Sequence, residues 1–198
     1  MKLLAFFILL YGCTQSNSLK IHSNEVSQIT QDSLMQYAKK EFEIIELEQK
    51  GDTLLIVSTN KVLFYPFGKY ANFKEFKDVY LIKRDLKVRI DSSFNIFRIF
   101  SIEDEKTNVK LIENTETERL ELFKADIRDD SFELFYGIRL GMKKDEVFLK
   151  FFIKTPPGLN HIRTIKIASG LEGIWYYFNF STKEQLENIK IESDYVLD

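Results

Sequence analysis

From Phe42 onward, the chain is divided into strand-length apolar segments separated by short polar turns. In the segment 84–90, apolar and charged residues alternate with a period of two, which is typical of a half-buried β-strand. Regular short strands with few helical segments favour an antiparallel sheet over β-α-β units. We therefore predict an α+β fold built on a largely antiparallel β-sheet. Strands are expected at 42–48, 52–59, 61–68, 84–90, 94–102, 107–113, 118–127, 131–138, 164–169, 173–181 and 186–192.

The composition agrees with a folded, aromatic-rich sheet protein. Of the 198 residues, 44% are hydrophobic and 29% charged, which excludes a disordered or fibrous class. Phe (18) and Tyr (9) are plentiful, whereas Gly (8) and Pro (3) are scarce, a balance that suits strands better than long loops. The net charge of −2 lacks the basic field of a nucleic-acid-binding protein. A single cysteine allows neither an intrachain disulfide nor a cysteine-built metal site.

Two or three helices are expected beside the sheet. A first helix is predicted to begin at Ser33, which has capping-box spacing with Gln36. A short helix is a further candidate at 71–80, and a third helix is predicted within 141–158, ended by its two prolines. The expected apolar faces are Leu34, Tyr37, Ala38 and Phe42 in the first helix; Phe73, Phe76 and Val79 or Tyr80 in the second; and Val147, Phe148, Phe151 and Phe152 in the third.

A weak internal similarity suggests a duplicated unit. Residues 63–76 align without gaps with residues 134–147, and in both copies a strand-like segment runs into a turn and a helix candidate. This predicts two weakly repeated α/β units with a sub-boundary near residue 130. The alternative is chance similarity in an aromatic-rich chain, because the third copy that is usual in repeat arrays is missing. The identical pairs are Leu63/Leu134, Phe64/Phe135, Tyr65/Tyr136 and Glu75/Glu146.

The N-terminus has the features of a secretory signal. Lys2 precedes eight apolar residues, Leu3 to Leu10, which as a helix extend only about 12 Å and are too short for a hydrocarbon core of about 30 Å. A basic residue followed by a short apolar run is typical of a signal peptide. The sequence Leu-Tyr-Gly-Cys at 10–13 resembles the lipobox of bacterial lipoproteins. The resemblance implies cleavage before Cys13 and a diacylglycerol thioether on its sulfur.

This interpretation divides the chain into a signal peptide (1–12), a polar flexible tether (13–28) and an α+β domain (29–198). Several acyl chains on Cys13 bind a membrane far more strongly than a single chain does, so stable anchoring is expected. The predicted location is the bacterial cell envelope, with the domain facing the periplasm from the outer membrane. The alternative is a buried N-terminal strand in which Cys13 is an inert thiol.

The C-terminal third suggests a family. The segment 137–152, GIRLGMKKDEVFLKFF, followed by GIWYYFNF and LENIKIE, resembles the BamE/SmpA-type outer-membrane lipoproteins and the related β-lactamase inhibitor protein fold. The resemblance implies helices packed on an antiparallel sheet, a protein-binding role and no catalysis. Lys143 departs from the pattern, because its side chain cannot accept the backbone hydrogen bond of a Ser or Thr N-cap.

The sequence lacks the motifs of common catalytic, metal-binding and phosphate-binding sites. The two histidines, His22 and His161, have no metal-ligand spacing, and neither a nucleophile elbow nor a phosphate-binding loop occurs. We therefore predict no catalytic residue, cofactor or metal. Asp126, Asp129, Asp130 and Glu133 form the densest carboxylate group apart from Glu103–Glu105, and we interpret that group as a solvated turn.

The candidate interface is one face of the segment 173–181, where Trp175, Tyr177 and Asn179 alternate with apolar residues. These side chains are core beneath a helix, anchors of a protein interface, or a platform on which a sugar stacks. A flat apolar patch would favour a protein partner and a shallow groove would favour a ligand. The leading hypothesis is a non-catalytic, lipid-anchored envelope protein that binds another protein. The alternative is an envelope lipoprotein that binds a glycan or small ligand on exposed aromatics.

Overall fold

The computed structural model describes residues 31–81, 86–93, 97–103, 105–171 and 173–194. The predicted signal peptide, Cys13 and the tether lie outside the described residues. Within the described ranges, no helix is long and apolar enough to cross a membrane.

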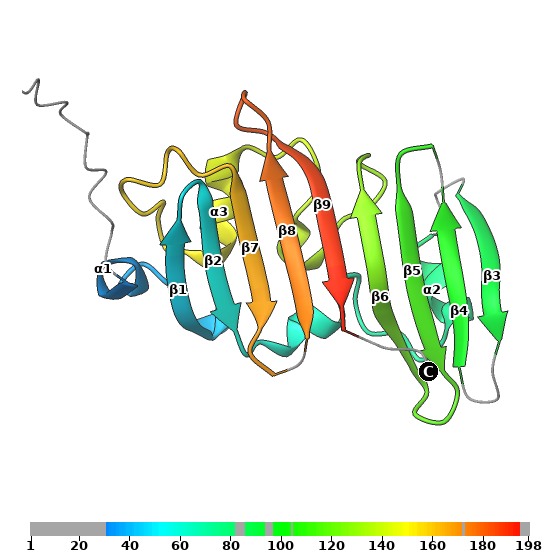
Figure 1. Cartoon of the computed structure of the whole chain (residues 1–198). Coiled ribbons are helices and arrows are strands. Elements are labelled where there is room, and N and C mark those ends of the chain that lie inside the picture. Colours follow the sequence, from blue (N-terminus) through cyan, green and yellow to red (C-terminus); the bar gives the residue numbers. More distant parts are fainter. Residues whose placement is uncertain (1–30, 82–85, 94–96, 104, 172, 195–198) are drawn as a thin grey trace, which may run out of the picture.

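Nine strands form one mixed sheet in the order β1-β2-β7-β8-β9-β6-β5-β4-β3 (Figure 1). Seven of its eight strand pairings are antiparallel and one, between β2 and β7, is parallel. The predicted α+β class with a largely antiparallel sheet is therefore confirmed. The strands are β1 (Ile44–Lys50), β2 (Thr53–Ser58), β3 (Lys87–Ser93), β4 (Phe97–Glu103), β5 (Asn108–Asn114), β6 (Arg119–Ile127), β7 (Thr164–Ser169), β8 (Ile174–Phe180) and β9 (Leu186–Ser193).

Three α-helices accompany the described part of the sheet: α1 (Gln31–Met35), α2 (Phe73–Val79) and α3 (Lys144–Phe151). Helices α2 and α3 lie on the same face of the sheet, behind it in Figure 1, and α1 lies beside β1. Short 3-10 helices occur at η1 (Lys40–Phe42), η2 (Lys61–Phe64) and η3 (Phe135–Gly137). Helices therefore cover one face of the sheet, and no helix of the described residues covers the other.

Two predicted strands, 61–68 and 131–138, are wrong, because each contains a 3-10 helix instead. The side chain of Asn60 caps η2 by accepting a hydrogen bond from the Val62 N–H at 2.9 Å. In η3, Tyr136 and Gly137 have positive φ angles of 57° and 73°, which interrupt an extended backbone.

The predicted first helix and the predicted half-buried strand at 84–90 also need correction, and helix α1 ends at Met35, before Tyr37, Ala38 and Phe42 of its predicted apolar face. Helix α1 begins at Gln31, and the Gln36 amide donates to the Ser33 carbonyl at 2.8 Å, so Ser33 is no N-cap and the capping box is wrong. On α2, Val79 is 62% exposed and Tyr80 packs against the core, so the structure selects Tyr80 from the two predicted alternatives. Strand β3 was expected to be half-buried, but Ile90 is 60% exposed, because β3 is an edge strand.

The core lies between the sheet and the helix layer. In β8 the buried residues alternate with half-buried ones, as the period of two predicts. The ring of Phe151 in α3 packs against Phe178 at a centroid distance of 6.1 Å, so the helix covers this face of β8. The largest fully buried side chains are aromatic: Phe42, Phe76, Phe132, Phe148, Phe151, Phe152, Tyr176 and Phe178.

The middle of the sheet contains a seam. Strands β6 and β9 pair over only four residues each, Lys124–Ile127 with Ile189–Glu192. On the helix side, the segment 63–70 crosses this seam: the Leu63 carbonyl accepts from the Tyr176 hydroxyl, and the Tyr70 carbonyl accepts from the Leu120 N–H at 3.0 Å. The segment therefore ties β8 to β6.

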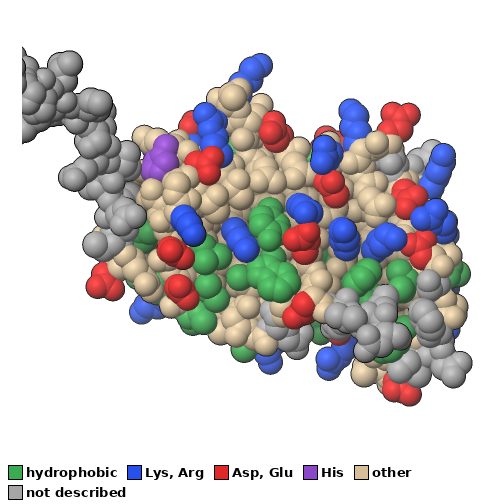
Figure 2. Space-filling view, viewed as in Figure 1, with side chains coloured by type: hydrophobic (Ala, Val, Ile, Leu, Met, Phe, Trp, Pro, Cys, Tyr) green, Lys and Arg blue, Asp and Glu red, His purple; other side chains and the backbone are tan. Residues whose placement is uncertain are grey.

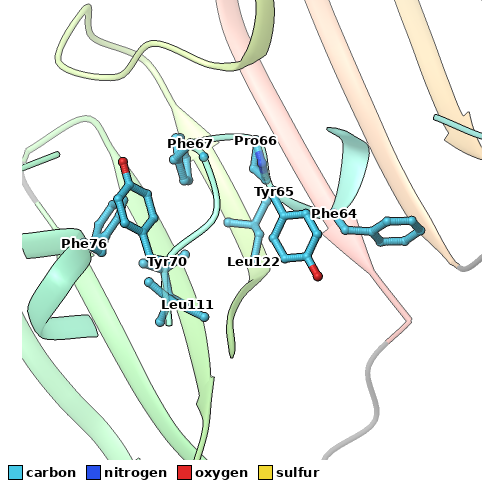
Figure 3. Close-up of a pocket in the computed structure, with 10 residues that line it drawn as sticks. Phe64, Tyr65, Pro66, Phe67, Tyr70, Phe76, Leu111 and Leu122 are labelled. Atoms are coloured by element: carbon cyan, nitrogen blue, oxygen red, sulfur yellow. The ribbon is translucent and has the colours of Figure 1, made fainter. Parts of the chain in front are cut away.

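A small pocket lies where the crossing segment packs on the sheet (Figure 3). Its volume is about 10 Å³, which is close to the space that a single water needs, so it has no room for a larger ligand. The helix side of the seam is therefore filled. The lining residues are Phe64, Tyr65, Pro66, Phe67, Gly68, Tyr70, Phe76, Leu111, Leu120 and Leu122.

Candidate functional site

The open face of the sheet, which we call the outer face, carries all three predicted interface residues. Trp175, Tyr177 and Asn179 are half-buried and lie on the side of β8 opposite α3. The interpretation of these residues as core beneath a helix is therefore wrong. Figure 2 shows apolar side chains gathered over the middle of this face, between basic and acidic side chains.

Trp175 borders an open hollow of about 320 Å³ on the outer face. The hollow lies at the seam, where β6 and β9 cease to pair. Tyr177 does not line it, so only one of the two predicted aromatics contributes. The lining residues are Phe123, Lys124, Trp175, Glu192 and Ser193.

A β-bulge borders this hollow. In the β5–β6 register Lys110 is opposite Lys124 but Leu111 is opposite Leu122, so Phe123 is an extra residue in β6. A bulge bends its strand and redirects the side chain of the extra residue. The Phe123 carbonyl accepts a hydrogen bond from the Ser193 hydroxyl at 2.7 Å, which fixes the bulge against the end of β9. Both residues of this hydrogen bond line the hollow, so the bulge forms part of its wall.

Tyr177 lies between two lysines from neighbouring strands. The Lys166 and Lys190 ammonium nitrogens are 5.3 Å and 5.9 Å from the centre of its ring, within the range of cation–π contacts. Lys190 also pairs with Glu192 at 2.6 Å. The hydrogen bond from Lys190 lowers the pKa of the Glu192 carboxyl, so this group is anionic at neutral pH.

Asn179 has a different role from the two aromatics. Its amide oxygen accepts from the Thr164 hydroxyl at 3.0 Å, and its amide nitrogen donates to Asn188 at 2.9 Å. Asn188 in turn donates to Asp126 at 2.6 Å. These bonds form a polar ladder across β7, β8, β9 and β6. Asn179 therefore links strands, whereas Trp175 and Tyr177 are the half-buried aromatic side chains of the outer face.

An apolar strip extends from Trp175 toward the β1 edge. Val57, Ala168 and Trp175 are cross-strand neighbours on β2, β7 and β8. Ile45 lies next to Val57, since a Cβ atom at Gly170 would meet side-chain atoms of both residues. Ile45 is 53% exposed. We define the apolar strip as Ile45, Val57, Ala168 and Trp175.

The remaining candidate residues contribute to structure rather than to a reactive centre. The His161 ring contacts the Gln49 amide at 2.8 Å, and Asp126 pairs with Arg128 at 3.1 Å. Asp129 accepts a hydrogen bond from the Ser131 N–H at 2.7 Å, as in a turn. In the described ranges, no group of three or more His, Cys, Asp or Glu side chains has a geometry that suits a metal ion.

Sequence reasoning missed the other side of the site. Phe123 and Lys124 are contributed by β6, and neither was considered as a site residue. Their proximity to Trp175 depends on the β6–β9 pairing and on the bulge, which have no local sequence signature. Comparisons of the chain with protein-family models, with curated proteins and with solved structures found no match.

Proposed function

We propose that this chain is a non-catalytic, lipid-anchored protein of the bacterial cell envelope that binds another protein through its outer face. The observation that carries this proposal is the apolar strip, which no helix of the described structure covers and which ends at the hollow beside Trp175. The helix side already provides the core, so folding does not require a tryptophan on the opposite side.

The composition of the outer face fits a protein interface. Interfaces concentrate Trp and Tyr in their centre and place charged residues around the rim. Here Trp175 and Tyr177 are central, and Lys124, Lys166 and Glu192 surround them. Leu171, in the turn between β7 and β8, adds a further apolar side chain that is 55% exposed. The hollow has room for a side chain of the partner.

The anchor is proposed from the lipobox resemblance at 10–13. We expect wild-type protein to remain in the membrane fraction after a high-salt wash, because acyl chains rather than charge hold it there. Cys13→Ala should be released into the soluble fraction or remain in its unprocessed form. A Cys13→Ala protein of mature size that stays with the membrane after the wash would remove the basis for the anchor.

We also infer that the domain contains two weakly repeated α/β units, as the internal similarity of residues 63–76 and 134–147 suggests. Helix α2 begins at Phe73 and α3 at Lys144, which is the offset of 71 found in the sequence alignment. Each helix is followed by consecutive antiparallel strands, and the last strands of the two sets, β6 and β9, meet at the seam. The hollow would then lie between two units, where binding sites are frequent.

The binding proposal is tested by affinity capture of the full chain from chemically crosslinked native membranes. Wild type is compared with Trp175→Ala and with Ile153→Ala, a control that removes a 67% exposed side chain outside the outer face. We expect one discrete co-purifying protein, retained by Ile153→Ala and lost with Trp175→Ala. A partner that is equally abundant in all three samples, or no partner in any of them, would contradict the proposal.

The hollow also favours the second candidate, a glycan or small ligand. Its volume is at the lower end of the range of about 300–1,000 Å³ for ligand pockets, and Trp175 offers a ring on which a sugar can stack. Trp175 is the only tryptophan, so its fluorescence reports directly on the hollow. A saturable fluorescence change with soluble envelope glycans would favour this candidate over a protein partner.

A further inference from the structure

We infer that the outer face takes an acidic segment of its partner: an apolar side chain enters the hollow beside Trp175, and flanking carboxylates meet Lys124 and Lys166. This inference rests on the proposed protein-binding function and names the chemistry of the partner. It follows from the charges around the hollow and from their spacing across the sheet.

The basic side chains around the hollow are only partly neutralised. Lys190 is paired with Glu192 at 2.6 Å. Among the described carboxylates, none lies within 4.0 Å of the ammonium nitrogen of Lys124 or Lys166. Lys124 is exposed and Lys166 is half-buried, so both ammonium groups remain available to a partner. In the described part of the chain, the Lys166 ammonium contacts only the Tyr177 ring. Lys124 interacts with Glu192 only at longer range, and the nearby Asp126 is paired with Arg128. The two lysines therefore leave a local positive potential that attracts acidic groups.

The strand register gives the spacing of the two lysines. Lys124 is on β6 and Lys166 on β7, with β9 and β8 between them, and the register also displaces them by two residues along the strands, so their Cα atoms are about 16 Å apart. An extended segment that crosses the strands covers about 13 Å in four residues. Two Glu residues four residues apart, whose side chains extend the reach at both ends, therefore match the two lysines, and a residue midway between them lies over β8 and β9 near Trp175 and Tyr177.

The same charges disfavour two other occupants. A basic segment would place cations against Lys124 and Lys166, and like charges across an interface cost binding energy. A second copy of the chain, docked outer face to outer face, would bring the same lysines toward one another. An acidic segment with a central apolar side chain is complementary to both the lysines and the apolar hollow of the site.

The test uses the full chain and three synthetic nine-residue peptides as probes. The first has Phe at its centre with Glu two residues to each side, and is otherwise made of Ser and Thr. The second replaces both Glu residues by Lys, and the third replaces the central Phe by Ser. Binding is followed by the fluorescence of Trp175, the single tryptophan.

We expect the Glu-Phe peptide to bind at least about tenfold more tightly than the other two, a difference of about 1.4 kcal/mol. Its affinity should fall as salt is raised, because exposed charges are screened. Saturable binding of the Lys-Phe peptide with equal or higher affinity would overturn the inference, as would the absence of saturable binding of the Glu-Phe peptide.

A charge-reversed variant tests whether Lys124 contributes to binding of the acidic peptide. Lys124→Glu should weaken binding of the Glu-Phe peptide at least about tenfold. Lys87→Glu, a control on the edge strand β3, should leave the affinity within about twofold. Equal effects of the two variants would overturn the inference. If membrane capture yields a partner that depends on Trp175 while the peptide tests fail, only the acidic chemistry is wrong; if capture fails, the proposed function itself is wrong.

Discussion

Strand β8 is aromatic on both of its faces, but the two faces have different surroundings. Tyr176 and Phe178 are fully buried against the helix layer and the crossing segment, where their rings stack in the core. Trp175 and Tyr177 are half-buried on the outer face, where a hollow and two lysines adjoin them. Removing side chains from the first face should cost stability, and removing them from the second should cost binding.

The largest expected effect comes from truncating a ring on the helix side. Phe178→Ala should lower the free energy of unfolding by about 3–5 kcal/mol, because it leaves a cavity in a packed core. Tyr177→Ala, its neighbour on the outer face, should cost less than about 1 kcal/mol. Urea unfolding followed by circular dichroism measures both. Similar losses in the two variants would remove the distinction between the faces.

A buried charge gives the next effect. The Lys144 ammonium, at the start of α3, donates to the Asn160 carbonyl at 2.5 Å and to Glu184 at 2.7 Å, and its side chain is 4% exposed. The ammonium also lies 3.4 Å from the Ile162 carbonyl, which is buried. Lys144→Ala removes these contacts and should cost about 1–3 kcal/mol of unfolding free energy. Lys143→Ala, at the adjacent exposed position, should stay within about 0.5 kcal/mol. Equal losses in the two variants would show that the buried contacts do not stabilise the fold.

A smaller effect on the unfolding free energy is expected at Asp91, on the edge strand β3. Lys110 and Ser101 donate to Asp91 at 2.8 Å and 2.5 Å, and these bonds hold the pKa of the Asp91 carboxyl well below its usual range. A lowered pKa stabilises the fold above the unfolded-state value of about 4, and this contribution decreases as the pH falls toward the folded-state pKa.

Asp91→Asn should therefore lower the unfolding free energy by about 1–2 kcal/mol near neutral pH, and the difference from wild type should shrink below about pH 4. Urea titrations at several pH values measure this dependence. Glu46→Gln, a substitution of an exposed residue on β1, serves as the control and should behave as wild type throughout. A constant difference at all pH values would contradict the assignment to the Asp91 carboxylate.

Local features of the fold could be predicted from the sequence. The alternation in β8 gives its buried face, and Gly51, with a φ of 61°, forms the turn between the expected strands 42–48 and 52–59. Helix α3 has the acidic first turn that the sequence indicates, and the Glu146 carboxylate accepts from the Lys143 N–H at 2.8 Å, which compensates for the missing side-chain cap.

Long-range features could not be predicted. The parallel pairing of β2 with β7 joins segments far apart in the sequence, and the choice of partner leaves no local pattern. The bulge at Phe123 depends on how β6 is aligned with β5, so neither Phe123 nor Lys124 could be assigned to the site. The sequence therefore identified Trp175 and Tyr177 on one strand, whereas the opposite wall of the hollow required the structure.

The smallest stability effect and the largest functional effect are expected at Trp175. Trp175→Ala should change the unfolding free energy by about 1 kcal/mol or less, because the side chain is only half-buried and lies outside the core. The same variant should lose the membrane partner. A large loss of stability would instead mean that the outer face contributes to folding.

The most direct measurement places a photo-crosslinking amino acid in living cells, at position 177 on the outer face in one strain and at position 153 on the helix side in another. We predict a discrete protein adduct from position 177 and none from position 153, since the partner contacts the open face of the sheet. An adduct from position 153 alone, or from neither position, would contradict binding through the outer face.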